Sequence, residues 1–359
     1  MAAAGSAGSA VGPVPLLLQG QDYAYRSATT GLDFQERMFA ADLVADAPGD
    51  PVPCVLVLAR AADMEMNALS LALAEHDVRM VRIDADRCLD LALTVYHDAP
   101  LLELGRWLLR PVLVWERHFD LTALPVDPTT AHGSYVREQW AAVSGWLTSR
   151  ADWEHINPAR GLDRMTQLRD ARAFGLPVPR SVVTTMPGRS RPGGGRCVVK
   201  TAGRHLLEPR PGALRGLFPR PLDVRRSGAG REPAPVLVQE HLDADHELRV
   251  FAVDDRLIAY RVRKLDPAQL WVDPEAVTVE PVEVPDALAA KLRALRRHWR
   301  LHVAAFDLLR VADDWYFLEV NVNCDWRWFE ERAGGTEVSD AVHRSVRERF
   351  AAATATTGW

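Results

Sequence analysis

Two acidic residues and an amide interrupt an apolar stretch near the C-terminus. The stretch "VAAFDLLRVADDWYFLEVNVN" predicts a β-hairpin, and a turn centred on Asp313 places Asp307 directly opposite Glu319. Asn321 shares the face of Glu319 because side chains alternate along a strand. Opposed carboxylates repel each other, but carboxylate and amide oxygens are ligands that Mg²⁺ accepts, usually together with water and phosphate oxygens. The spacing therefore predicts a metal site.

Two cations on apolar strands indicate a site for an anion. Lys200 ends the strand "RCVVK", and Arg249 lies within "ELRVF". An arginine on a mostly buried strand requires an anionic partner. If the hairpin that contains Arg249 turns at Asp254–Asp255, Lys264 and Glu247 lie on the same face as Arg249. Lys264 could then add a positive charge beside Arg249.

Each of these assignments has a plain structural alternative. A register slip of one residue separates the two acids and leaves Glu319 as a surface acid on an edge strand. Lys200 could extend its ammonium group into solvent. Glu247 and Lys264 could form a simple ion pair, and the spacing alone does not choose between these alternatives.

A β-α-β unit near the N-terminus indicates an α/β domain. Cys54 to Leu58 and Val78 to Ile83 are predicted strands, and Asp63 is a plausible N-cap for the helix between them. The first turn, Ala59 to Ala62, contains no glycine, so it is not the glycine-rich dinucleotide-binding turn. Residues 110–118 predict a further strand.

The rest of the chain alternates strands and helices. A helix before Gly175, a strand from Ser181 and the strand "VLVQEHL" are expected, and residues 203–235, rich in Gly, Pro and Arg, predict a mobile surface segment. The last helix, "SDAVHRSVRERFAAA", has Ser339 as its expected N-cap.

Composition excludes several classes of protein. The chain has 359 residues and a net charge of −5, so two or three domains are expected and a nucleic-acid partner is not. No apolar run is long enough to span a membrane. The four cysteines form no CxxC pair, which argues against a zinc site or a disulfide framework and favours the cytoplasm. Residues 1–20 read as a disordered Ala/Gly/Ser tail.

The order of the motifs resembles the ATP-grasp ligases. "AFDLL" followed by "YFLEVNVN" is similar to their metal-binding hairpin, and "CVVK", "VLVQEHLDADHELRVFAV" and "DRMTQLRDARAFGLPVPRSVVTT" fit the preceding blocks. The resemblance is strongest to the microviridin-type peptide macrocyclases (graspetide synthetases), whose ending LEVNPNGQWLWIE reads "LEVNVNCDWRWFE" here. This chain departs from the pattern at Val322, Cys324 and Asp325, and it has Arg164 where relatives usually have lysine.

The resemblance implies an ATP-grasp fold of the α/β (α+β) class in three parts. After the tail, residues 21–155 would form the N-terminal pre-ATP-grasp α/β domain. Residues 156–239 would form a small central lid, and residues 240–359 a C-terminal domain with an antiparallel sheet that carries the metal-binding hairpin.

The resemblance also implies a role for each matching residue. Asp307, Glu319 and Asn321 would bind Mg²⁺, and Arg249 and Lys264 would be catalytic. The residues implied to contact ATP are Arg164, Lys200, Gln239, Glu240, His241, Leu242 and Glu247. Backbone groups of Glu240 to Leu242, and not their side chains, would hydrogen-bond adenine. The alternative for His241 is a histidine on the surface without a role in binding.

The implied activity is the cyclisation of a ribosomally made precursor peptide. ATP would phosphorylate an Asp or Glu side chain, and a hydroxyl or amine would attack the acyl phosphate to form an ester or amide. The expected partner is a precursor with leader and core, without nucleic acid or membrane, and a homodimer is left open. The rivals are a ligase that adds a residue to a peptide or small acid, a kinase, and a homologue that binds nucleotide or peptide without turnover.

Overall fold

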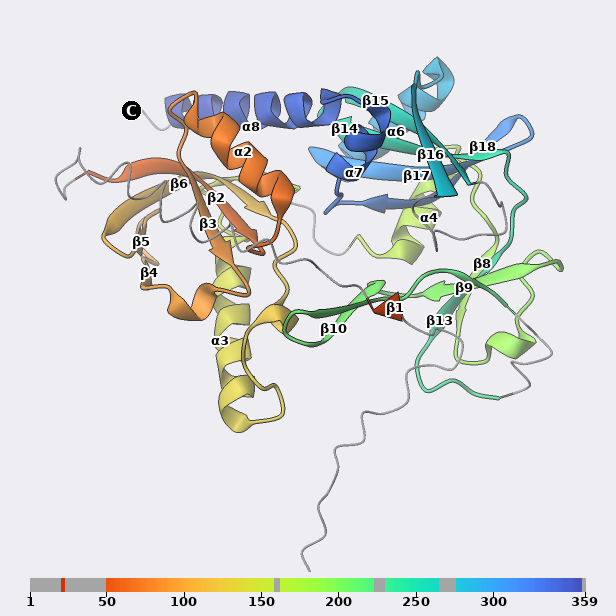
Figure 1. The fold of residues 1–359 in the computed structure, drawn as a ribbon, viewed down its shortest axis with the longest axis horizontal. Coiled ribbons are helices and arrows are strands. Elements are labelled where there is room, and N and C mark those ends of the chain that lie inside the picture. The colour runs from red at the N-terminus through yellow and green to blue at the C-terminus, as the bar shows by residue number, and fades with distance from the viewer. Residues whose placement is uncertain (1–20, 23–49, 158–161, 223–229, 265–275, 357–359) are drawn as a thin grey trace, which may run out of the picture.

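The structure, a computed structural model, describes residues 21–22, 50–157, 162–222, 230–264 and 276–356. Its strands form separate N-terminal, central and C-terminal sheets, and a small three-stranded sheet beside them (Figure 1). The expected tail, residues 1–20, lies outside the described residues. Within the described ranges, no helix is long and apolar enough to cross a membrane.

The N-terminal sheet has the strand order β3-β2-β6-β5-β4, with β7 beside β6. Its parallel part consists of β2 (Val52–Ala59), β3 (Met80–Asp84), β6 (Trp107–Glu116) and β7 (Glu154–Ile156). The short strands β4 (Leu93–Val95) and β5 (Leu102–Leu104) extend it antiparallel. The helices of this domain are α2 (Met64–Ala74) and α3 (Ala131–Leu147), and the short 3₁₀ turns are η2 (Cys88–Asp90) and η3 (Leu121–Ala123).

The predicted β-α-β unit is confirmed. The central strand β2 is covered on both faces, with Cys54 to Ala59 completely buried, as is typical of a parallel sheet with packed faces. Asp63 is the N-cap of α2, and its side chain accepts a hydrogen bond of 3.1 Å from the Met66 amide. The predicted strand at 110–118 is β6, which begins three residues earlier.

The central sheet is antiparallel and small. Its order is β12-β9-β13-β8, from β8 (Ser181–Thr184), β9 (Cys197–Thr201), β12 (Arg220–Pro221) and β13 (Val236–Glu240). Helix α4 (Arg164–Ala173) precedes it, and the 3₁₀ turn η4 (Pro187–Arg189) follows β8. The third sheet joins β1 (Gln21–Asp22), β11 (Ala213–Gly216) and β10 (Leu206–Arg210).

The prediction of a mobile segment at 203–235 is wrong for its first part. The strands β10 and β11 pair with each other there, and β12 pairs with β9. Gly212, with φ of +80°, supplies the left-handed turn between β10 and β11. The Gly and Pro content therefore marked tight turns between short strands.

The C-terminal sheet carries the acids singled out above. Its order is β16-β15-β14-β17-β18, all antiparallel. The strands are β14 (His246–Val253), β15 (Arg256–Lys264), β16 (Val277–Val282), β17 (Val303–Val311) and β18 (Asp314–Asn321). Strands β14 and β15 turn at Asp254–Asp255 as predicted, since Val253 pairs with Arg256.

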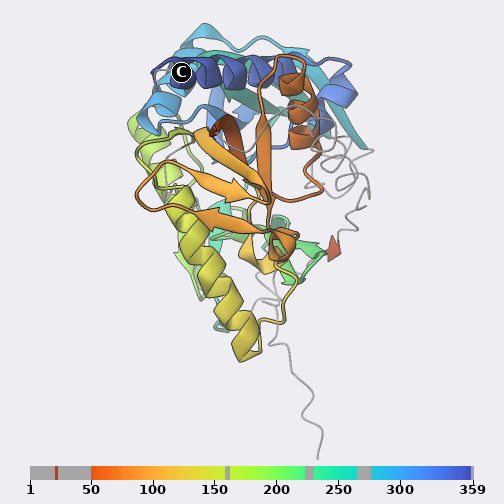
Figure 2. The ribbon, with the colours of Figure 1, turned by 90° about the vertical axis from the view of Figure 1, so that its left-hand side faces the viewer.

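Helices cover both faces of this sheet. On one face, α6 (Asp286–His298) buries Leu288, Leu292 and Leu295 in a hydrophobic cluster that also includes residues of α4. On the other lie α7 (Arg327–Ala333) and α8 (Glu337–Thr356), and α8 also contacts α2 and β6 of the N-terminal domain. Figure 2 shows α8 running across the top of the molecule. Helix α8 begins at Glu337, so Ser339 lies in its first turn and is not its N-cap.

Candidate functional site

Strands β17 and β18 bring the predicted metal ligands together. Asp307 lies opposite Glu319, as predicted, but the turn lies at Ala312–Asp313 and is not centred on Asp313. The register shifts between Asp307 and the next pair, which leaves Leu318 as an extra residue in β18. This β-bulge moves the pairing by one residue, so the acids face each other although the turn was misplaced.

Arg249 pairs with the first of these acids. It lies opposite Asp307 in the ladder between β14 and β17, and its Nη1 is 2.7 Å from each Asp307 carboxylate oxygen. Asn321 donates a hydrogen bond of 2.8 Å from Nδ2 to Asp307 Oδ2. Burial raises the pKa of Asp307 to about 6, with Glu319 adding to the rise and Arg249 opposing it.

Helix α4 brings a second arginine to the other acid. The Gln167 side chain accepts a hydrogen bond from the Val320 amide at 2.9 Å and donates one to the Val320 carbonyl at 3.2 Å, which docks α4 on the edge strand β18. Arg164, the first residue of α4, thereby reaches Glu319, with Nη2 2.5 Å from Oε2. Its Nη1 also donates to the Thr201 carbonyl, at 3.1 Å, which ties α4 to the central sheet.

Lys200 and His205 face the same acid from the central region. Burial lowers the pKa of Lys200, and the negative charge of Glu319 opposes this effect. Burial likewise lowers the pKa of His205, and the negative charge of Glu319 opposes that lowering. In return, burial raises the pKa of Glu319, but Arg164 and Lys200 outweigh that effect and leave it below its ordinary value.

Lys264 takes the alternative arrangement that the sequence left open. Its Nζ forms an ion pair with Glu247 Oε1. The pair lies beside Asp307 and Lys200, because the charge of Glu247 contributes to the pKa values of both residues. No phosphate contact by Lys264 or nucleotide contact by Glu247 follows from this pairing, and both remain predictions.

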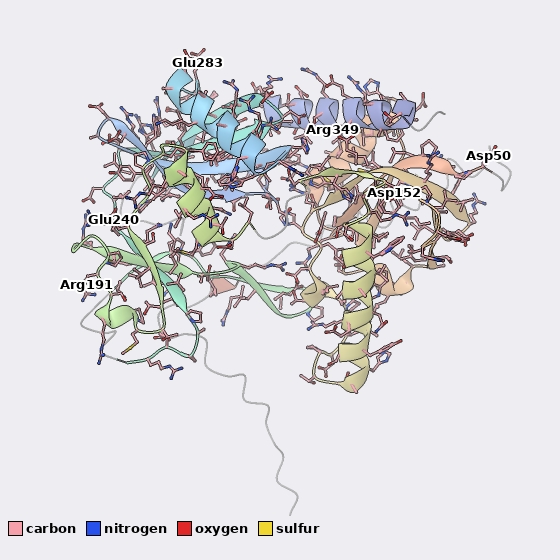
Figure 3. The ribbon with its side chains drawn as sticks, turned by 180° about the vertical axis from the view of Figure 1, so that it is seen from behind. Asp50, Asp152, Arg191, Glu240, Glu283 and Arg349 are labelled. Atoms are coloured by element: carbon pink, nitrogen blue, oxygen red, sulfur yellow. The ribbon has the colours of Figure 1, made fainter. Side chains whose placement is uncertain are left out.

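The predicted adenine-binding segment follows the end of β13. Gln239 is buried and donates from Nε2 to Ser181 Oγ at 3.0 Å. The amides of Glu240 and His241 donate to the carbonyls of Arg180 at 2.9 Å and Arg196 at 2.8 Å. Figure 3 shows Glu240 on the side of the central sheet that faces the C-terminal sheet. Those two amides therefore already have acceptors within the chain, and an adenine contact by this segment remains a prediction.

The side chains Arg164, Lys200, Arg249, Asp307, Glu319 and Asn321 thus form one group, here called the acid–arginine cluster. His205 is a neighbour that the sequence pattern did not indicate, since it lies in the segment predicted to be mobile. No periodic or motif signal distinguishes it from the other histidines.

The acid–arginine cluster fits an anion together with a divalent cation. Three cations face two acids, so the group has an excess of positive charge that suits phosphate oxygens. Within the described chain, Arg249 Nε is buried without a hydrogen-bond partner. Arg137, Arg261, Arg296 and Arg349 share that feature, so it supports an anion only together with the position of Arg249 in the cluster.

The oxygen atoms of the cluster also suit Mg²⁺, an ion that takes part of its ligands from phosphate and water. They do not suit a metal whose ligands all come from the protein. In the described part of the chain, no three His, Cys, Asp or Glu side chains could hold a metal ion together. Two carboxylates and an amide oxygen, completed by phosphate and water oxygens, match the usual surroundings of Mg²⁺. Asn321 would have to turn its amide oxygen toward the ion, because its nitrogen now contacts Asp307.

Comparison with known proteins shows the fold. No family model and no curated protein sequence matches the chain. The macrocyclase MdnC from Microcystis aeruginosa MRC, solved with the precursor peptide MdnA, is similar over 81% of this chain and 98% of its own, with 18% identity and a TM-score of 0.67. The ATP-grasp ligase PsnB, solved with minimal precursor, Mg and ADP, has 19% identity and a TM-score of 0.67 over 85% of this chain and 100% of its own.

A third solved structure agrees. The Chryseobacterium gregarium RiPP-associated ATP-grasp ligase, in complex with ADP and a leader and core peptide, has a TM-score of 0.66 and 15% identity over 83% of this chain and 97% of that one. The chain therefore has the ATP-grasp fold, as the motifs of its sequence predicted.

Proposed function

We propose that this protein is an ADP-forming ligase that uses ATP and Mg²⁺ to cyclise a ribosomally made precursor peptide. The observation that carries the proposal is the acid–arginine cluster, in which Asp307 and Glu319 face each other among Arg249, Arg164 and Lys200. The ATP-grasp fold of the chain supports the same conclusion, because solved structures of that fold contain ADP, Mg and precursor peptides.

The proposed reaction has two steps. A side-chain carboxylate of the peptide attacks the γ-phosphorus of ATP, so that a bond to phosphorus forms and ADP leaves. A hydroxyl or amine of the same peptide then attacks the acyl carbon, loses its proton and displaces inorganic phosphate. Asp307, Glu319 and Asn321 would hold Mg²⁺, which when bound neutralises negative charge on the transferred phosphoryl group.

The cations of the cluster would bind the phosphates. Arg249, with a buried donor not bonded by the described chain, would hold the γ-phosphate and then the acyl phosphate. Lys200 and Arg164 would contact the phosphates nearer the adenosine, and Arg164 would then exchange Glu319 for phosphate as a partner. The Leu242 amide and the Glu240 carbonyl would hydrogen-bond adenine, and Gln239 and His241 would support that segment.

Further elements of the proposal follow from the resemblance. The three-part division at residues 21–155, 156–239 and 240–359, a cytoplasmic location and a leader-containing precursor remain predictions. Metal binding and the microviridin-like choice of substrate stand with them. The motif order "CVVK", "QEHL", "ELRV" and "LEVNVN" supports these predictions, except for the cytoplasmic location, which is supported by the four scattered cysteines.

The test is incubation of the protein with ATP, Mg²⁺ and a precursor peptide encoded beside its gene, followed by mass spectrometry. Loss of one water per bond, with one ADP formed, supports cyclisation. A gain in mass equal to an amino acid less one water indicates the rival ligase, and a retained phosphate indicates a kinase. Absence of ADP formation with any peptide or small acid would contradict the proposal.

A further inference from the structure

Arg117 is a fully buried arginine outside the acid–arginine cluster, and each of its three side-chain nitrogens has a partner. Nε donates to Asp63 Oδ2 at 2.8 Å. Nη1 donates to the carbonyl of Cys324 at 2.6 Å, and Nη2 donates to Asp325 Oδ1 at 2.7 Å. The guanidinium also lies over the ring of Trp326, with Cζ 4.8 Å from its centroid. Arg117 therefore joins the N-terminal domain to the segment that follows β18.

Neighbouring residues hold the same segment. Glu65 Oε1 accepts hydrogen bonds from the amides of Trp326 at 3.2 Å and Arg327 at 3.4 Å, where α7 begins. His118 Nε2 is 3.0 Å from Asp325 Oδ1. Asn157 Nδ2 donates to the Val322 carbonyl at 3.1 Å. The chain from 322 to 327 is therefore fixed at nearly every residue by groups from the first half of the protein.

The location of Arg117 in the N-terminal sheet explains why these groups converge. Asp63 and Glu65 follow β2, and Arg117 and His118 follow β6. In the strand order β3-β2-β6, the strand that follows β2 in the chain, β3, lies on one side of β2. The later strand β6 lies on the other side. Parallel sheets form a crevice at the carboxyl ends of two such strands, and many α/β proteins bind a ligand there. Here the segment 324–327 occupies that position.

Segment 322–327 begins one residue after Asn321, the last residue of β18 and a proposed metal ligand. A change in its path moves the end of the strand that carries Asn321 and Glu319. We propose that Arg117 is a positioning residue for phosphoryl transfer: by fixing Cys324 and Asp325 it holds this end of β18 at the geometry that the site requires. This inference rests on the proposed function.

Stability alone is a poor explanation for such a group. Replacing a buried ion network with packed apolar side chains is often neutral or stabilising, so a buried arginine is weak evidence for stability. Two of the hydrogen bonds of Arg117 are to neighbouring residues of one short segment, and one of their acceptors is a main-chain carbonyl. Together they restrain the position and direction of that segment. Displacements of about 1 Å far from the chemistry can lower turnover about 100-fold.

The test compares Arg117→Lys with a matched control, Arg82→Lys. Arg82 is also a buried arginine beside the N-terminal sheet's helix α2, but within the described chain it is bonded to Asp84 at 2.8 Å, to Asn67 and to the Arg60 carbonyl, and not to residues 322–327. Lysine keeps the charge in both variants but cannot reach three partners at once. Asp325→Asn is the second variant, since it removes the carboxylate and leaves an acceptor for Arg117.

We expect Arg117→Lys to lower kcat for ADP formation about 10- to 100-fold while KM for ATP changes less than about twofold. Arg82→Lys should keep kcat within about twofold at a similar loss of Tm. Amide hydrogen exchange without nucleotide provides a readout independent of activity: it should accelerate at 322–327 in Arg117→Lys and in Asp325→Asn, and not in Arg82→Lys.

The outcomes separate this inference from the proposed function. Equal losses of kcat in both lysine variants, or unchanged exchange at 322–327 in Arg117→Lys and Asp325→Asn, would overturn the positioning role. If the wild type forms ADP but no peptide ring, the proposed substrate fails while the kinetic comparison still decides the role of Arg117. If the wild type forms no ADP, the proposed function fails, and hydrogen exchange alone decides whether Arg117 fixes the segment.

Discussion

Two arginines of this protein, the buried Arg117 and the half-buried Arg249, lie among acids, and they differ in what completes their hydrogen bonds. Arg117 is bonded through Nε, Nη1 and Nη2 to other groups of the chain. Arg249 bonds both oxygens of Asp307 through Nη1 alone, and its buried Nε has no partner in the described chain. The first network is complete within the folded chain, whereas the second leaves a donor for a ligand.

The balance of charge differs in the same direction. Around Arg117 the acids outnumber the arginine, because Asp63, Glu65 and Asp325 all lie within ion-pair distance of its side chain. Around Arg249 the cations outnumber the acids, as Arg164 and Lys200 join it. A site for polyphosphate needs the second arrangement, while the first suits a contact between two parts of a fold. The difference supports the proposal that the Arg249 cluster binds a ligand, while the Arg117 network holds two parts of the fold together.

The largest expected effect is on stability, and it should distinguish the two arginines. We expect Arg117→Met to lower the free energy of unfolding by about 3–5 kcal/mol, because it leaves buried acids without their partner. Arg249→Met should cost less, about 1–2 kcal/mol, because the pKa of Asp307 is already raised and this carboxyl can take up a proton. Urea denaturation of both variants measures the difference; equal losses would remove the distinction.

Turnover should depend strongly on the acid–arginine cluster, which is expected to contribute less to stability than the Arg117 network. We expect Glu319→Gln to lower the rate of ADP formation by at least about 100-fold, because a carboxylate that would hold Mg²⁺ against phosphate is lost. Glutamine keeps the size of the side chain but loses the charge that pairs with Arg164, so Tm should fall while the protein still folds. A coupled assay for ADP measures the rate.

The matched control for that variant is Asp314→Asn. Asp314 is an exposed acid at the start of the same strand, paired with Val311 next to the turn. Its loss should leave the rate within about twofold of wild type. If Glu319→Gln and Asp314→Asn had the same activity, the catalytic assignment of the cluster would be wrong.

How far the sequence predicts these two clusters depends on the separation of their members. Asp307, Glu319 and Asn321 lie on one hairpin, so strand alternation is enough to place them together. Even there, the turn was misplaced by the pattern, and the β-bulge at Leu318 could not be read because no glycine marks it. The sequence thus predicted that the two strands of the hairpin pair, but it did not predict the β-bulge between them.

The Arg117 network gave no such local signal. Its partners at Cys324 and Asp325 are 207 and 208 residues away, and nothing in "VWERHF" distinguishes a buried arginine from a solvated one at a strand end. The docking of α4 through Gln167 on Val320 spans 153 residues and was equally hidden. Contacts of this kind follow from the packing of whole domains, which hydrophobic periodicity does not specify.

A smaller effect should follow from removing Lys200, a cation that contacts no acid of the described chain at hydrogen-bond distance. We expect Lys200→Met to raise KM for ATP about tenfold, since one favourable charge near phosphate is worth about 1.4 kcal/mol. Lys291→Met is the control, because Lys291 lies on α6 and donates to the Gly175 carbonyl at 2.7 Å. KM values from initial rates decide the matter; an unchanged KM in Lys200→Met would move Lys200 outside the phosphate site.

The smallest effect is a difference in how the two clusters respond to pH. Burial raises the pKa of Asp307 from 3.8 to about 6, so the folded state binds this proton more tightly, and the group loses stabilising effect as pH rises between those values. For Asp325, whose side chain is 63% exposed, desolvation can oppose ionisation only weakly, and His118 and Arg117 lower its pKa to about 2. Its contribution is therefore present above 3.8 and is lost as pH falls toward 2.

These opposite signs predict diverging melting curves for two asparagine variants. Tm of Asp307→Asn relative to wild type should rise by about 2 °C from pH 4 to pH 6 and stay level above. Tm of Asp325→Asn should lie below wild type throughout that range and approach it only as the pH falls below about 4. Differential scanning calorimetry of the three proteins from about pH 3 to about pH 7 covers both trends. Parallel curves would mean that the two carboxyls share one kind of environment, and the contrast between a complete and an incomplete arginine network would then fail.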